Sequence, residues 1–151
     1  VLIDLDLTLR KKMTRTLEPA IVTFLKDTMK QYNFQTLSIA SNNMLKLESY
    51  SRPVKARLFQ PFWRRFVLIR KPHILFYERI LQTLKAQPHE CVMIGDKLRG
   101  DVYGGNNAGV HTVQVHPKGH DYWYDRILFT RHRERRALSK YHTPGTKPGK
   151  S

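Results

Sequence analysis

The sequence predicts one α/β domain built on a doubly wound, Rossmann-like parallel sheet of about five strands. Three short apolar runs indicate this fold class, at residues 1–4, 37–40 and 91–94. A buried parallel strand appears in a sequence as such a continuous apolar run. The segments between the runs have helical spacing, and strands that alternate with helices over short connections form a parallel sheet. At 151 residues the chain is long enough for one domain with a core and too short for two.

The first helix is predicted over residues 19–31. Pro19 suits the first turn of a helix, where a missing backbone N–H does no harm. Ile21, Phe24 and Leu25 follow at helical spacing. The pattern therefore favours a single amphipathic helix.

The remaining elements are predicted from the same signals. In chain order we expect a strand over 34–41, a short helix over 42–50, a short strand over 66–69, a helix that begins at Pro72 and ends near Lys85, a strand over 90–94, a helix over 101–107 closed by Gly109, and a last strand over 110–115. The interval between Ser41 and Lys71 has room for a helix and a short strand but not for a folded lid. We therefore expect no additional folded unit in this interval.

Residues 119–151 differ in composition from the rest of the chain. Residues 119–141 predict a basic amphipathic helix packed on or beside a domain of residues 1–118. Residues 142–151 are rich in Gly, Pro and Lys, and we expect them to form a disordered basic tail.

The charge of the chain is strongly one-sided. It carries 27 Lys and Arg against 12 Asp and Glu, a formal net charge of +15. Residues 49–77 contain no acid at all and interleave bases with aromatic side chains. This composition indicates a polyanionic partner, which could be nucleic acid, a ribosome or an anionic lipid surface. The alternatives are a charge that serves only solubility and a core position for Phe59, Phe62 and Phe66.

The compartment is only weakly constrained. A single cysteine, Cys91, excludes an internal disulfide and favours a reducing compartment. No apolar run approaches the roughly 20 residues that span a bilayer. The sequence begins at Val1 without a methionine, so we expect a processed or truncated chain from which a targeting peptide could be missing. These observations favour the cytoplasm or the mitochondrial matrix, with peripheral contact to a membrane.

Polar side chains follow the three apolar runs at the point where each ends. They are Asp4 and Asp6 at the end of the first run, Ser41 and Asn42 after the second, and Asp96 after the third. Ligands of open α/β sheets bind beyond the carboxyl ends of the strands. Three carboxylates at one such edge form a hard oxygen site that suits Mg²⁺.

These residue types can together transfer a phosphoryl group. With a magnesium ion to neutralise charge, one Asp can attack phosphorus and form an aspartyl-phosphate. A second acid can protonate the leaving oxygen and later activate water. Ser41 and Asn42 can donate hydrogen bonds to phosphoryl oxygens, and Lys71 can balance negative charge. Each residue alone is weak evidence, whereas their joint order is much stronger.

In this order and spacing the sequence resembles the haloacid dehalogenase superfamily of phosphotransferases. Four segments carry the resemblance: Asp4-Leu5-Asp6-Leu7-Thr8, Ser41 after an apolar strand, Lys71, and Gly95-Asp96 with Asp101 five residues after Asp96. The resemblance extends over the chain to about residue 140, and it implies a capless catalytic domain, since the interval between Ser41 and Lys71 has no room for a lid. A second Asp at position 6 favours phosphate chemistry over dehalogenation.

The resemblance also implies a role for each site residue. It makes Asp4 the nucleophile, Asp6 the general acid and base, and Lys71 the group that stabilises charge. Phosphate contacts are then expected from Thr8, Ser41 and Asn42, and magnesium ligands from Asp4, Asp6 and Asp96. Asp101 has a supporting place, either as a further ligand or as a group that orients Lys71 or caps a helix.

Three further segments are similar to the YqeG branch of subclass IIIA, which includes phosphatidylglycerophosphate phosphatases. They are Ser41-Asn42-Asn43, Arg70-Lys71-Pro72, and the run from Asp101 to Gly109 that contains Gly104-Gly105-Asn106. The branch implies a magnesium-dependent phosphatase whose phosphorylated substrate is phosphatidylglycerophosphate at an anionic membrane. Two alternatives stay open: an RNA- or ribosome-associated protein on the same fold, and a phosphatase that acts on macromolecular phosphate. Lys97 and the basic segment 52–66 depart from the branch and leave the substrate open.

Overall fold

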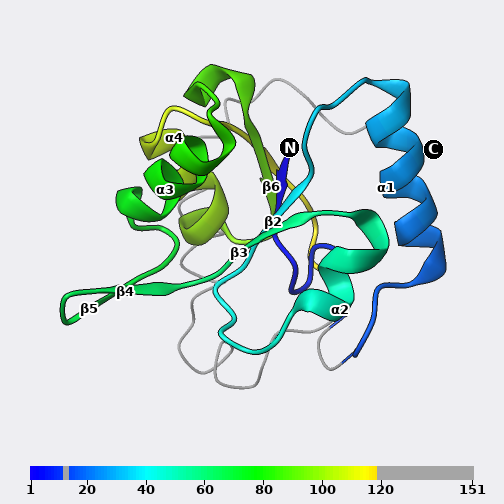
Figure 1. The fold of residues 1–151 in the computed structure, drawn as a ribbon, viewed down its shortest axis with the longest axis horizontal. Helices are drawn as coiled ribbons and strands as arrows, with labels where there is room; N and C mark the ends of the chain where they lie inside the picture. The colour runs from blue at the N-terminus through cyan, green and yellow to red at the C-terminus, as the bar shows by residue number, and fades with distance from the viewer. Residues whose placement is uncertain (12–13, 119–151) are drawn as a thin grey trace, which may run out of the picture. The chain divides into compact units, whose positions relative to one another are not determined.

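The structure of the chain is a computed structural model that describes residues 1–11 and 14–118 (Figure 1). The chain divides into two units, Val1–His120 and Asp121–Ser151. The helix predicted over residues 119–141 and the tail predicted over 142–151 lie outside the described residues. No helix in the described ranges is both long and apolar enough to cross a bilayer.

The first unit is built on a sheet of five parallel strands in the order β3-β2-β1-β6-β7. The strands are β1 (Leu2–Ile3), β2 (Ser38–Ala40), β3 (Arg57–Phe59), β6 (Val92–Gly95) and β7 (His111–Gln114). The most amino-terminal strand, β1, lies at the centre and pairs with β2 on one side and β6 on the other. The predicted fold class is confirmed.

Helices cover both faces of the sheet. Leu2 packs into an apolar cluster with Phe76 and Ile80 of α3 (Ile74–Leu84), whereas Ile3 packs into a second cluster with Leu25 of α1 (Pro19–Gln31). Successive side chains of a strand point to opposite faces, so one two-residue strand contributes to both cores. Figure 1 shows α1 on one side of the sheet and α3 on the other.

The predicted helices differ in how well they match. α1 begins and ends as predicted, with Pro19 in its first turn. α3 begins at Ile74, two residues later than predicted, because His73 is extended and its Nδ1 accepts a hydrogen bond from the Leu75 N–H at 3.2 Å, which caps the helix.

The short helix predicted over residues 42–50 is largely wrong. The helix α2 covers only Glu48–Ser51, followed by the 3₁₀ turn η1 (Arg52–Val54), and residues 42–47 form a loop. Asn43 explains the difference, because its Oδ1 accepts the Leu45 N–H at 2.9 Å. Such a local side-chain bond competes with helical backbone bonds.

The strand predicted over residues 66–69 exists but lies outside the main sheet. β5 (Val67–Ile69) pairs antiparallel with β4 (Phe62–Arg64) in a hairpin, and the edge strand of the sheet is β3, which we did not predict. β3 reads as an exposed base followed by two apolar residues, so it has no long apolar run that would reveal it.

The segment after β6 is helical and begins earlier than predicted. A wide, π-type turn η3 (Leu98–Tyr103) leads directly into α4 (Gly104–Asn107). Gly109 ends this segment with a φ of 74°, a conformation that suits glycine.

Candidate active site

The carboxyl ends of β1, β2 and β6 meet at one edge of the sheet, and each delivers a predicted site residue. Asp4 follows β1, Ser41 follows β2 and Asp96 follows β6, and all three are buried. The Asp4 N–H donates to the carbonyl oxygen of Ile94 at 2.8 Å, which continues the pairing of β1 with β6 up to the site. The topology therefore gathers residues that are far apart in the sequence.

Lys71 lies at the centre of this group. Its Nζ is 2.6 Å from Oδ1 of Asp4 and 2.6 Å from Oδ1 of Asp101. The ammonium group and both carboxylates are almost fully withdrawn from solvent. One cation therefore bridges two buried carboxyl groups.

Burial and charge shift the ionisation of these groups in opposite directions. Burial raises the pKa of Asp4 to about 7, against the opposing effect of Lys71. Burial by itself would lower the pKa of Lys71, but the carboxylates of Asp4 and Asp101 outweigh it and raise that pKa. Lys71 is therefore a fixed positive charge, whereas Asp4 is held close to its titration range near neutral pH.

Asn42 fixes the backbone of Lys71. The Lys71 N–H donates to Oδ1 of Asn42 at 2.9 Å, and Nδ2 of Asn42 donates to the Lys71 carbonyl oxygen at 2.9 Å. Both polar atoms of the Asn42 amide bind the main chain of Lys71, and the phosphate contact expected of Asn42 stays a prediction. This paired contact links the end of β2 to the segment that precedes α3.

Asp101 is held from two sides. Its Oδ1 contacts Lys71, and its Oδ2 accepts the backbone N–H of Lys97 at 3.0 Å. Gly95 makes room for it, since a Cβ at that position would lie 2.2 Å from Oδ2 of Asp101. The hydroxyl of Tyr77, whose pKa burial raises, donates to the Gly100 carbonyl oxygen at 2.8 Å and supports the same turn.

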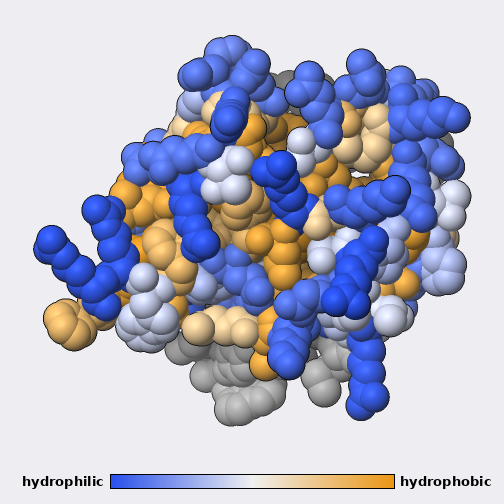
Figure 2. Space-filling view, viewed as in Figure 1, coloured by the Kyte–Doolittle hydropathy of each residue, from blue (hydrophilic) through white to orange (hydrophobic). Residues whose placement is uncertain are grey.

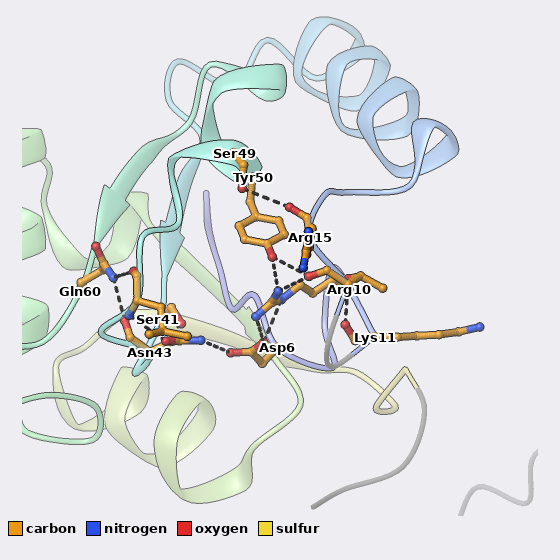
Figure 3. A network of polar contacts seen from close by, with 11 residues as sticks. Asp6, Arg10, Lys11, Arg15, Ser41, Asn43, Ser49, Tyr50 and Gln60 are labelled. Carbon is orange, nitrogen blue, oxygen red and sulfur yellow. Dashed lines mark hydrogen bonds and ion pairs between the residues drawn. The ribbon is translucent and has the colours of Figure 1, made fainter.

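Asp6 belongs to a different set of contacts (Figure 3). Its Oδ1 accepts Nε of Arg10 at 2.9 Å and lies 2.6 Å from Nη2, and its Oδ2 accepts Nδ2 of Asn43 at 3.4 Å. Arg10 in turn donates to the hydroxyl of Tyr50 and lies over the Tyr50 ring, with Cζ 4.4 Å from the ring centroid. The Asp6 side chain stays 25% exposed, so this carboxylate can exchange protons with water.

The two predicted hydroxyl contacts lie beside these clusters. Thr8 donates from Oγ1 to Oδ1 of Asp96 at 3.4 Å. Ser41 is buried, and its Oγ accepts the Asn43 N–H at 3.1 Å. Ser41 thus adjoins the loop that carries Asn43 to Asp6.

Three buried carboxylates could hold a metal ion. Among the described residues, Asp4, Asp96 and Asp101 each offer an oxygen, and these atoms lie within 4.8 Å of one another. An all-oxygen, anionic donor set fits a hard cation such as Mg²⁺. This group differs from the predicted set, because it includes Asp101 and not the carboxylate of Asp6.

Sequence analysis missed several residues that shape the site. Arg10 and Tyr50 hold Asp6, and Tyr77 supports the turn that carries Asp101. The only sequence signal for Arg10 is its position four residues after Asp6, whereas nothing in the sequence distinguishes Tyr50 or Tyr77 from core aromatics.

Comparison with known proteins agrees with this geometry. A HAD-hydrolase-like family model matches residues 68–120. The chain is 31% identical over 140 residues to "Probable phosphatase YqeG" of Bacillus subtilis (strain 168), which covers 92% of this chain and 76% of that protein.

Two solved structures share the fold. A protein from Listeria monocytogenes serotype 4b superposes with a TM-score of 0.59 at 20% identity, over 76% of each chain. The HAD-hydrolase YfnB from Bacillus subtilis, whose structure is described as bound to magnesium, superposes with a TM-score of 0.51 at 18% identity, over 66% of this chain and 45% of that one. The match to YqeG over most of both sequences confirms the resemblance that the four motifs indicated: this chain belongs to the haloacid dehalogenase-like hydrolase family.

Proposed function

We propose that this HAD-family phosphatase hydrolyses phosphomonoesters through an aspartyl-phosphate formed on Asp4. One observation carries the proposal: Lys71 Nζ lies 2.6 Å from the carboxylates of both Asp4 and Asp101 inside a buried, oxygen-rich site. A buried carboxylate that is oriented by a fixed cation fits the requirements of a nucleophile that attacks an anionic phosphoryl group.

The first half of the reaction transfers the phosphoryl group to the protein. A carboxylate oxygen of Asp4 attacks phosphorus as the bond to the leaving oxygen breaks, and Asp6 gives that oxygen its proton. Attack from Oδ2 would leave the ion pair between Oδ1 and Lys71 in place. Asp4, Asp96 and Asp101 would hold Mg²⁺, which would supply the positive charge that lets two anions approach.

The second half releases phosphate. Asp6, now ionised, takes a proton from a water molecule, whose oxygen attacks phosphorus and displaces the Asp4 carboxylate. The partial exposure of Asp6 supports this role, because the residue must exchange protons with solvent and a leaving group. Arg10 and Asn43 hold its two oxygens and so fix its direction.

Magnesium is the cofactor that this proposal requires. The acidic group of Asp4, Asp96 and Asp101 supports it, as does the magnesium bound in the structure of YfnB, which shares the fold. Thr8, which donates to Asp96, and Ser41 would then lie where they can contact phosphoryl oxygens.

We further propose phosphatidylglycerophosphate in an anionic membrane as the substrate. Within the described residues, the interval between Ser41 and Lys71 holds no lid domain that could shield a small substrate from water. Exclusion of water must then come from the substrate or its carrier. The net charge of +15 and the three segments that resemble the YqeG branch support an anionic lipid.

The test is magnesium-dependent phosphate release by wild type and Asp4→Asn. Two substrates are offered: vesicles containing phosphatidylglycerophosphate, and a soluble generic phosphomonoester. We expect Asp4→Asn to lose roughly 10³-fold or more of the activity, while Asp27→Asn, an exposed aspartate on α1, keeps it.

The outcomes separate mechanism from substrate. Release from the soluble ester alone would retain the mechanism and exclude the lipid. Full activity of Asp4→Asn would remove this residue as the nucleophile. No release by wild type from either substrate would contradict the enzymatic proposal and favour an RNA- or ribosome-bound protein.

A further inference from the structure

The hairpin β4–β5 has an anchored base and an exposed tip. At the base, Ile69 is buried, and Phe62 packs against the core beneath Arg79, whose Cζ is 4.3 Å from the Phe62 ring centroid. At the tip, Phe66 is 96% exposed and Trp63 is 64% exposed. The hairpin therefore holds large apolar side chains in solvent on a rigidly attached support.

The turn of the hairpin contains an arginine in the left-handed backbone conformation. Arg65 and Phe66 form it, and Arg65 has a φ of 54°, in the left-handed region. Such turns favour Gly, Asn or Asp, and an arginine there is held in an unfavourable conformation. The hairpin therefore ends in a charged and an aromatic side chain in place of the residues that such a turn favours.

The charge of the hairpin is uniformly positive. Arg64 and Arg65 are exposed at the tip, Arg70 is exposed just after the base, and no acid occurs in residues 49–77. Figure 2 shows long hydrophilic side chains projecting beside the hairpin, at the lower left, next to a hydrophobic group at its end. Apolar groups flanked by arginines suit a surface that is anionic outside and apolar below.

The hairpin lies at the same edge of the sheet as the candidate active site. It starts just beyond the carboxyl end of β3, and its last residue is two positions before Lys71. Gln60, at the start of the hairpin, donates from Nε2 to the carbonyl oxygens of Asn43 at 2.8 Å and Leu45 at 2.7 Å. That loop carries two further exposed apolar side chains, Met44 and Leu45.

We propose that the β4–β5 hairpin docks this protein on anionic bilayers by inserting Trp63, Phe66 and Val67 into the lipid interface, with Arg64, Arg65 and Arg70 on the headgroups. Aromatic and aliphatic side chains bury in the interfacial layer while bases bind anionic lipid, so the two contributions add. The proposal rests on the proposed function in one respect, that the bilayer holds the phosphorylated substrate.

The same features fit RNA less well. Val67, Met44 and Leu45 are aliphatic and cannot stack on bases, and all three are exposed. Proteins that bind single strands use a basic groove lined by aromatic platforms, whereas this element is a projecting hairpin. The lipid surface is therefore the partner for which we argue.

The test measures vesicle binding of the full chain by co-sedimentation, without substrate. Vesicles of phosphatidylcholine with one-third phosphatidylglycerol are compared with vesicles of phosphatidylcholine alone. We expect wild type to bind the anionic vesicles and Phe66→Ser/Trp63→Ser to bind them at least tenfold more weakly. Phe24→Ser is the matched control, because Phe24 is a 62% exposed phenylalanine on α1 and should not alter binding.

Folding and function are measured separately from binding. The midpoint of thermal unfolding of Phe66→Ser/Trp63→Ser should match that of wild type, since both side chains are exposed. Phe66→Ser alone is the second variant if the double variant unfolds. In the hydrolysis assay, KM for vesicular substrate should rise and kcat should not fall.

Each other outcome overturns the proposal. Unchanged vesicle binding by the folded variants would assign docking to another part of the chain. Binding of wild type to a single-stranded RNA oligonucleotide but not to vesicles, lost in Phe66→Ser, would make the hairpin a nucleic-acid surface. Failure of wild type to bind vesicles, with soluble ester still hydrolysed, would reject docking and leave the mechanism standing.

Discussion

Asp4 and Asp6 lie two residues apart, yet the protein gives them opposite environments. Asp4 is buried, and the cation that it contacts, Lys71, comes from 67 residues away in the sequence. Asp6 is partly exposed, and its cation, Arg10, comes from four residues away. The same functional group is thus built into the core in one case and into a local loop in the other.

This difference shows how one short segment can supply one buried aspartate and one that stays in contact with solvent. Burial brings the pKa of Asp4 to about 7, and only the fixed charge of Lys71 keeps a carboxylate tolerable there. Asp6 keeps contact with solvent while Arg10 and Asn43 direct it. The residue that we propose as the nucleophile is shielded from solvent, and the residue that we propose for proton transfer is not.

The largest effect on stability is expected from Lys71→Met, which removes the cation that contacts Asp4. The substitution leaves two buried carboxylates without their shared cation, which should lower the free energy of unfolding by about 3–5 kcal/mol at pH 8. Because protonated carboxyls tolerate burial, the loss should shrink as the pH falls toward 4. Urea denaturation at several pH values measures it.

Added Mg²⁺ and the control variant Lys97→Met test the explanation of the Lys71→Met result. Added Mg²⁺ should recover part of the stability of Lys71→Met by binding the folded form. Lys97→Met, at an exposed lysine of the same edge, should change the unfolding free energy by no more than about 0.5 kcal/mol. Equal losses for both variants would contradict the central place that we give Lys71.

The second prediction uses pH to separate the stability of Asp4 from its chemistry. The folded-state pKa of Asp4, about 7, is raised above the unfolded value of about 3.9. Between these values the unfolded chain releases a proton that the folded protein keeps, so wild type loses stability as the pH rises from 4 to 7. Asp4→Asn cannot titrate there, and should be more stable than wild type by about 2–4 kcal/mol at pH 8 without magnesium.

The raised pKa of Lys71 does not alter this window. Its contribution is present below about pH 10 and disappears only at higher pH, so it is constant from pH 4 to 8. Magnesium should reduce the advantage of Asp4→Asn, because the cation stabilises the ionised form. Thermal or urea unfolding that shows the same difference at pH 4.5 and pH 8 would refute the pKa assignment.

The third prediction concerns the backbone that supports the Asp4 side. Gly95→Ala places a Cβ 2.2 Å from Oδ2 of Asp101, so the buried carboxylate must move away from Lys71. Overpacking of this kind should lower the free energy of unfolding by about 1–3 kcal/mol and reduce magnesium-dependent hydrolysis.

Gly100→Ala is the matched control. The nearest atom to its new Cβ would be Cβ of Lys97 at 3.6 Å, an ordinary contact, and the carbonyl oxygen that binds Tyr77 is retained. Its stability should stay within about 0.5 kcal/mol of wild type. If both substitutions cost the same, the close approach at Gly95 does not constrain the site.

The sequence could predict the residues that the sheet brings together, but not those whose place depends on individual side-chain contacts. The three apolar runs located the central strands, and the carboxyl ends of parallel strands meet at one edge whatever their exact lengths. Asp4, Asp96 and Ser41 could therefore be predicted as neighbours. The edge strand β3 could not, because it is exposed on one side and basic, and its pairing depends on β2.

Contacts that depend on the direction of a side chain could not be predicted from the sequence either. The amide of Asn42 binds the main chain of Lys71, which lies 29 residues away in the sequence. Nothing in the local sequence marks that pairing, since it depends on how the ends of β2 and β5 come together. The hairpin was visible only as a basic, aromatic segment, and the structure shows Phe59 in the core and Phe66 in solvent.

The smallest effect is expected on the Asp6 side, where the cation is local and the carboxylate is partly exposed. Arg10→Met removes the charged partner of Asp6 and the group stacked on Tyr50. Because water can replace part of what Asp6 loses, the free energy of unfolding should fall by only about 1–2 kcal/mol. Hydrolysis should fall about tenfold, since a misdirected acid impairs a proton transfer that contributes roughly 10²–10⁴-fold.

Tyr50→Phe separates the two contacts between Arg10 and Tyr50. It keeps the ring beneath Arg10 and removes only the hydroxyl that accepts from the guanidinium and donates to the Thr14 carbonyl oxygen, so it should cost about 0.5–1.5 kcal/mol. Arg15→Met, at an exposed arginine nearby, controls for the loss of a positive charge and should change neither the free energy of unfolding nor the activity. Since Asp6 keeps its contact to Arg10 in Tyr50→Phe, this variant should retain more activity than Arg10→Met. The reverse order would mean that Tyr50, and not Arg10, sets the direction of the acid.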